Sequence, residues 1–251
     1  MRSIKALVFV LSSLLGLAPA ARAAVLPFEG TLEVRIGGAD SLFAITTTAA
    51  GSAFAQVNGS GAAGHLQSLE VGAGAFDSGV VEVPLTDPAA APFVGMQLDV
   101  ENQAGSFSGT GGAGFGGAMP LAGSFRLCTY PAPCMSAVNN LVVPLTVVGH
   151  ASTHTQVGAL NLTVVGAPWT TGTVAVGSLT AMGGVGPLSN TGAPSGTVTL
   201  VTPIFISTNL TNAVVPSFAT MSLHFVPEPT TLTLLGAALV GVGALGRSRL
   251  R

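Results

Sequence analysis

The feature that most limits the fold is a series of short segments in which polar and apolar residues alternate. The segment 31–36 reads TLEVRI, and a period of two places its apolar side chains on one face of a half-buried strand. Later segments hold longer runs of Val, Ile, Thr and Phe, which favour a pleated surface. The other strand-like segments are 65–71, 94–100, 141–148, 157–165, 196–207 and 218–225. None of the residues between 24 and 225 form a convincing amphipathic helix pattern.

Clusters of Gly, Asn and Pro separate these segments and mark turns. About ten to thirteen short strands in one chain predict an all-β fold, an antiparallel β-sandwich that is jelly-roll-like. Pro144 and Pro203 are expected on edge strands, where a missing backbone donor is tolerated. A β-solenoid is the alternative, although the sequence shows no fixed repeat period.

The N-terminus has the three parts of a secretory signal peptide. Arg2 and Lys5 give a positive start, residues 6–17 are apolar, and Ala21-Arg22-Ala23 has the small-x-small form that a signal peptidase accepts. We therefore expect residues 1–23 to be removed by cleavage after Ala23, with cleavage after Ala24 as the second choice, and the chain to be exported. An uncleaved membrane anchor is the alternative, but the apolar run is short for a membrane span.

The C-terminus has a similar set of parts in reverse order. Val226-Pro227-Glu228-Pro229 precedes an apolar segment at 232–245, and the chain ends with Arg247, Arg249 and Arg251. We expect a transmembrane helix at about 230–246, with the arginines as a basic stop on the cytoplasmic side. The two prolines cannot continue that helix backwards, so the segment before it should be extended and accessible.

This order of Pro-Glu-Pro, apolar helix and Arg-rich end resembles the PEP-CTERM sorting signal of exported proteins in bacteria that make exopolysaccharide. The resemblance covers residues 226–251 only. It implies that an exosortase in the inner membrane recognises Pro227, Glu228 and Pro229, so that the protein is anchored transiently and then released to the cell surface or matrix. A plain C-terminal anchor is the alternative. The resemblance implies nothing about residues 24–225, which we expect to form the β-rich extracytoplasmic domain.

The charges of that domain are few and unevenly distributed. Charged residues are 7% of the chain, against roughly 25% in an ordinary globular protein. Nine of the ten acids lie between Glu29 and Glu101, and Arg35 and Arg126 are the only Lys or Arg residues between 24 and 225, which leaves a net charge of about −7. Nucleic acid is disfavoured as a partner, because phosphate binding needs clustered cations. The uncharged stretch 127–227 suits a neutral partner such as exopolysaccharide, another surface protein or ice.

A glycine-rich segment at 105–117 contains the letters GxGxxG at 109–114. The dinucleotide fingerprint needs a strand before it, a helix after it and an acid about 20 residues further on. No helix-forming sequence follows here, and no acid lies between Glu101 and Glu228. We therefore predict a linker or a long hairpin loop, and no cofactor.

Cys128 and Cys134 are the only cysteines, in the sequence CTYPAPC. After export into an oxidising compartment we expect them to form a disulfide, whose small loop would be stiffened by two prolines. Redox and zinc sites are the rival interpretations, but the spacing is neither C-x-x-C nor that of a zinc finger.

His150 and His154 have a spacing that could bind a metal if they lay on a helix. Their segment is flanked by strand-like runs, so a loop is expected, and the other histidines, His65 and His224, are distant in sequence. We predict no metal site. The acids Asp40, Asp77, Asp87, Asp99 and Glu101 do not have the spacing of a calcium-binding EF-hand loop.

No nucleophile motif or catalytic carboxylate pair stands out. Trp169 is the only tryptophan, and we expect it to pack in the core or a loop, with sugar stacking as the alternative. The sequence thus favours a non-enzymatic matrix protein over a secreted polysaccharide hydrolase. Ice binding would need a regular array of threonines, and the T-x-T pattern occurs only in isolated pairs such as Thr197 with Thr199.

Overall fold

The computed structural model describes most of the predicted extracytoplasmic domain. The described residues are 22–36, 43–58, 65–84, 93–109, 114–129, 140–147, 152–157, 160–177, 179–186, 188, 196–208 and 214–226. All secondary-structure elements in these ranges are β-strands, so the predicted all-β class is confirmed. The predicted tail after Val226, including Pro227, Glu228, Pro229, the helix at about 230–246 and the three terminal arginines, lies outside the described residues.

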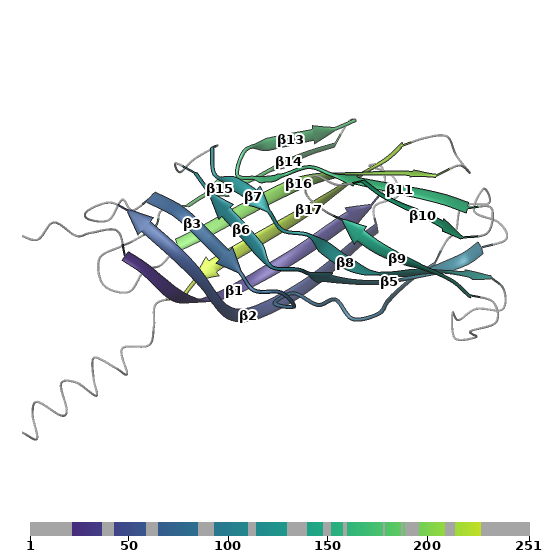
Figure 1. Ribbon diagram of the computed structural model, residues 1–251, viewed down its shortest axis with the longest axis horizontal. Helices are drawn as coiled ribbons and strands as arrows, with labels where there is room; N and C mark the ends of the chain where they lie inside the picture. Colours follow the sequence, from purple (N-terminus) through teal and green to yellow (C-terminus); the bar gives the residue numbers. More distant parts are fainter. Residues whose placement is uncertain are drawn as a thin grey trace, which may run out of the picture.

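Eight strands pair antiparallel into a closed barrel (Figure 1). The ring closes because the last strand, β17, pairs with the first strand, β1, on one side and with β16 on the other. Closure of this kind leaves no free sheet edge within the ring. In ring order the strands are β1 (Arg22–Ile36), β2 (Phe43–Asn58), β3 (His65–Val71), β6 (Gly105–Ser108), β7 (Gly116–Ala118), β12 (Trp169–Thr170), β16 (Gly196–Thr208) and β17 (Val214–Phe225).

The other strands extend or cover this ring. A separate four-stranded sheet has the order β4 (Val81–Pro84), β5 (Phe93–Asn102), β8 (Leu121–Thr129) and β9 (Asn140–Val147). Further strands pair with β16 directly or through one another, namely β15 (Gly184–Val185), β11 (Leu160–Gly166) and β10 (Ser152–Val157). A separate hairpin of β13 (Thr173–Val176) and β14 (Leu179–Met182) contacts β16 and β17, and Figure 1 shows it above β16.

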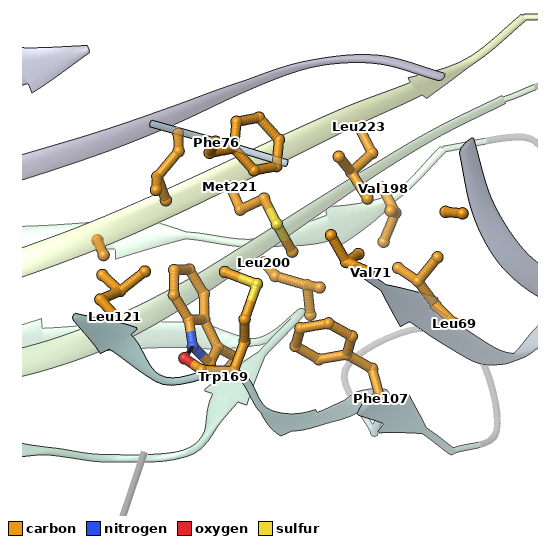
Figure 2. Packing of buried hydrophobic residues seen from close by; sticks show 14 of the residues in the cluster. Leu69, Val71, Phe76, Phe107, Leu121, Trp169, Val198, Leu200, Met221 and Leu223 are labelled. Atoms are coloured by element: carbon orange, nitrogen blue, oxygen red, sulfur yellow. Dashed lines mark hydrogen bonds between the residues drawn. The ribbon is translucent and has the colours of Figure 1, made fainter. Parts of the chain in front are cut away.

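One hydrophobic core joins the barrel and the four-stranded sheet. Alternate residues of the long strands point inward, so that Leu200 of β16 and Met221 and Leu223 of β17 are fully buried. Leu98 and Phe125 of the second sheet belong to the same apolar cluster. Figure 2 shows inward side chains from several strands meeting around Leu200 and Met221. The alternation read from the sequence therefore corresponds to one shared interior.

The segment between β3 and β4 is held by buried and partly buried hydrogen bonds. The Asn102 side-chain oxygen accepts from the Phe76 N–H at 2.7 Å, and its amide nitrogen donates to the carbonyl oxygens of Gly72 and Gln103. Thr47 adds a bond from its hydroxyl to the carbonyl oxygen of Asp77. Phe76 is thereby fixed in the core, with its ring centroid 6.0 Å from that of Phe28.

The architecture differs in part from the sequence prediction. The hydrogen-bonded pairing closes a barrel and does not establish the expected jelly-roll-like sandwich. The described strands pair antiparallel, whereas a β-helical solenoid stacks its strands in parallel. Strand β9, which carries Pro144, ends its sheet as predicted. The edge position of Pro203 was wrong, because β16 lies inside the ring. The proline is tolerated there since β16 changes partner at this point, from β11 at Ile204 to β12 at Val201.

Both ends of the described domain are at the same end of the barrel. The Val226 N–H donates to the Pro27 carbonyl oxygen, so Val226, the last described residue, lies beside the first half of β1. The predicted cleavage point after Ala23 falls inside β1, where Ala23 is opposite Gln56. Cleavage there would leave β1 paired with β2 from Ala24 onward. Among the described residues, no helix is long and apolar enough to span a membrane.

Candidate functional surface

A row of four hydroxyl side chains crosses the outside of the barrel. Strand register places Thr48 of β2 opposite Thr31 of β1, Thr31 opposite Ser222 of β17, and Ser222 opposite Thr199 of β16. Because neighbouring strands lie about 4.8 Å apart, the row extends over about 14 Å. We call these four residues the hydroxyl row.

The hydroxyl row borders a shallow hollow of about 500 Å³. The neighbouring row of residues is Ala50, Glu29, His224 and Thr197, again one from each strand. The small side chain of Ala50, next to the larger Glu29, leaves room in this part of the sheet surface. The hollow is lined by Glu29, Gly30, Thr31, Thr48, Ala49, Ala50, Thr197, Ser222, Leu223 and His224.

Side-chain hydrogen bonds between β16 and β17 order one side of the hollow. The Thr199 and Ser222 hydroxyl oxygens are 3.1 Å apart, and the Thr197 hydroxyl oxygen is 3.2 Å from Nδ1 of His224. A hydroxyl has one donor hydrogen and two acceptor lone pairs. Each of these groups can therefore still bond to a ligand after making its bond within the protein.

A second hollow, of about 250 Å³, continues along β1 and β17. Glu33, Arg35, Phe218 and Thr220 line it from the barrel, and residues 179–182 of β14 form its other wall. We call the two hollows together the outer groove, because successive residues of the same two strands line them.

The β13–β14 hairpin makes this wall by packing on the outside of the barrel. Val201 and Phe218 are on the outward face of their strands but are only 0% and 4% exposed. Val176 of β13 is also buried, and none of the three belongs to the main core cluster. The hairpin, which contacts both β16 and β17, thus covers apolar residues next to a polar groove.

The charges at the groove come from β1 alone. Arg35 donates from Nε to a carboxylate oxygen of Glu33 at 2.5 Å. Both side chains are partly exposed, so this ion pair contributes little to stability. Glu29, on the same face of β1, makes no ion pair with any described residue. Strands β16 and β17 add only hydroxyls, an imidazole and apolar groups, because the stretch 127–227 has no charged residue.

The spacing of the groove carboxylates does not match a glycosidase. Glu29 and Glu33 are four residues apart on one strand, which separates their Cα atoms by about 13 Å. Retaining and inverting enzymes place their two carboxyl groups about 5.5 Å and at most about 9.5 Å apart. Asp99 and Glu101 of β5 are nearer to each other, but Glu101 is exposed and accepts a hydrogen bond from Gln103.

The glycine-rich segment forms a hairpin, as one of the two sequence alternatives predicted. Residues 105–108 are β6 and residues 116–118 are β7, and the two strands pair antiparallel. No helix follows the GxGxxG letters, so the context of a dinucleotide site is missing. A Cβ on Gly117 would collide with the backbone of Ser106 and Phe107. This glycine is therefore needed for close strand packing.

Trp169 is a core residue, as expected. Its side chain is 1% exposed, and its Nε1 donates to the Met119 carbonyl oxygen at 2.9 Å (Figure 2). An indole with this environment cannot stack on a sugar at the surface.

Cys128 is buried in β8 and is disulfide-bonded. Cys134 lies outside the described residues, so the identity of the partner stays a prediction. Since the chain has only these two cysteines, an intramolecular bond requires this pair.

The histidines are not brought together by the fold where it is described. His154 lies in strand β10 opposite Thr163, so the loop predicted there was wrong for this residue. His150 is outside the described residues. His65 begins β3 and His224 is near the end of β17. Within the described ranges, no group of three or more His, Cys, Asp or Glu side chains could hold a metal ion.

The hydroxyl row was missed from the sequence because its members come from four separate segments. Thr197 and Thr199 were interpreted as an isolated pair, and only strand register places residues 31, 48 and 222 beside them. The available signals were the three consecutive threonines at 46–48 and the alternating Thr220 and Ser222, but they do not say which strands are neighbours. No protein-family model, curated protein or solved structure matches this chain.

Proposed function

We propose that this chain is an exported, non-enzymatic protein of the cell surface or extracellular matrix, which associates with exopolysaccharide through the outer groove. The observation that carries the proposal is the hydroxyl row, beside a hollow large enough for a small ligand segment. Hydroxyl and carboxylate groups are suited to hydrogen-bond a sugar chain, and their arrangement in the groove lacks the carboxylate spacing of a glycosidase.

The delivery route in this proposal comes from the two ends of the sequence. Residues 1–23 direct export, and the tail from residue 226 is recognised by an exosortase at Pro227, Glu228 and Pro229 in the inner membrane. The common position of the two chain ends supports this order, because the barrel can fold outside the membrane while anchored at one end. The outer groove runs along the outside of β1 and β17 away from that end, from Glu29 and His224 to Arg35 and Phe218.

Fractionation of the native host tests the location and the association. We expect the mature protein in the exopolysaccharide fraction, with intact mass corresponding to a start at Ala24 and an end near Pro229. A protein that still carries Arg251 and stays in the inner membrane would reduce the tail to an anchor. A processed protein that is absent from the washed matrix would contradict the association.

The alternative function is a secreted hydrolase acting on polysaccharide. Asp99 and Glu101, two residues apart on one face of β5, are one pair of described acids at which such an enzyme can be tested. Asp77 is the bridge partner of Glu101. Release of reducing ends from the host exopolysaccharide, and its loss in Asp99→Asn, would favour this alternative. No reducing-end release by the purified protein is expected under the matrix proposal.

A further inference from the structure

The composition of the outer groove restricts the charge of its ligand. Glu29 is exposed in the first hollow, and Arg35, the cation of the second hollow, already bonds to Glu33. Lysine does not occur between residues 24 and 225. An anionic polymer would therefore place its charges beside Glu29 with no available cation to compensate them, and like charges at an interface disfavour binding.

We propose that the outer groove binds a neutral, hydroxyl-rich polysaccharide and excludes acidic polysaccharides. This inference rests on the proposed matrix function and names the ligand class for it. Each residue of the hydroxyl row can donate and accept, as can each hydroxyl of a neutral sugar. An extended chain crossing from β2 to β16 meets a hydroxyl about every 4.8 Å, one on each strand.

Glu29 adds an acceptor at the edge of this row. Hydrogen bonds from sugar hydroxyls to a carboxylate are stronger than those between neutral groups. The groove lining described above includes no Trp or Tyr for stacking, so affinity per site should be low. With only hydrogen bonds to hold the sugar, we expect a dissociation constant per site on the order of 1 mM.

Affinity electrophoresis in native gels suits binding of this strength. The processed protein purified from its host is run through gels that contain dextran, hydroxyethyl cellulose or alginate. We expect a neutral polymer to retard the protein and alginate to leave its mobility unchanged. Retardation by alginate equal to that by the neutral polymers, or no retardation by either neutral polymer, would overturn the proposal.

Two pairs of variants locate the binding in the groove. Thr31→Val keeps the shape and β-branching but removes the central hydroxyl, and should weaken retardation about three- to tenfold. Thr173→Val, the same change on the exposed part of β13, should have no effect. Glu29→Lys should gain retardation by alginate, whereas Glu70→Lys on β3 makes the same change in net charge outside the groove and should gain none.

The outcomes separate this inference from the proposed function. Equal binding by Thr31→Val and wild type, with Trp169 fluorescence showing both folded, would refute the groove as the site. A protein found in the host matrix but not retarded by neutral polymers would refute the ligand class and leave the matrix function standing. A protein absent from the matrix refutes the function itself.

Discussion

Asn102 should be the most sensitive polar residue of the domain, because its side chain is completely buried and bonds to three backbone groups. It accepts from the Phe76 N–H and donates to the carbonyl oxygens of Gly72 and Gln103. These bonds position the segment that inserts Phe76 into the core. Asn102→Ala removes all three bonds, and the alanine side chain offers no new partner to the three backbone groups.

The expected loss follows from counting the groups left without partners. A buried donor without an acceptor costs about 1–3 kcal/mol, and each of the two partly buried carbonyls loses a bond worth about 0.5–1.5 kcal/mol. The sum is a loss of about 2–6 kcal/mol in the free energy of unfolding. This is a large share of the roughly 5–15 kcal/mol typical of a domain.

Equilibrium urea unfolding measures this loss, and the single buried tryptophan, Trp169, provides the fluorescence signal. With an m-value of about 2 kcal/mol/M, the midpoint for Asn102→Ala should fall by about 1–3 M. The matched control is Gln103→Ala, which deletes an amide whose only described side-chain bond is to exposed Glu101, at 3.0 Å. Its effect should stay within about 0.5 kcal/mol. Equal midpoints for the two variants would refute the assigned role of Asn102.

Two further predictions concern the glycine-rich hairpin and the disulfide. Gly117→Ala should destabilise the domain, because the added Cβ would collide with the backbone of Ser106, whereas Gly184→Ala meets nothing within 4 Å and should be close to neutral. The measurement is the urea midpoint, and equal midpoints would argue against close packing at this position. Cys128→Ser should lower stability by about 2 kcal/mol, the loop-closure contribution of so short a loop. Non-reducing peptide mass spectrometry should find Cys128 linked to Cys134, and two free thiols would contradict the disulfide.

The local structure was readable where the two faces of a strand differ in polarity. Alternation in 31–36 predicted the inward Leu32 and Val34, because each strand residue faces opposite to the next. For Trp169 the residue type alone predicted packing in the core or a loop. Its hydrogen bond to the Met119 carbonyl oxygen could be seen only in the folded structure. At β3 simple alternation fails. A bulge near Gln56 shifts the register, so Leu66, Leu69 and Val71 are the buried residues.

The closure of the barrel could not be read from any segment, because it depends on pairing between residues about 190 positions apart, such as Leu32 with Met221. The same pairing changed the interpretation of Pro203. A sequence pattern shows that a strand has a polar and an apolar side, but it does not identify the two neighbouring strands.

The sequence by itself determined the all-β class and the low charge of the C-terminal half, because these are local or compositional properties. It also predicts export and sorting signals at the two ends. Only the tertiary structure decided which hydroxyls lie together. Thr31, Thr48, Thr199 and Ser222 form one row because hydrogen bonding between strands sets their register. Side chains that do not stand out along the chain thereby form the proposed binding surface only when four strands align.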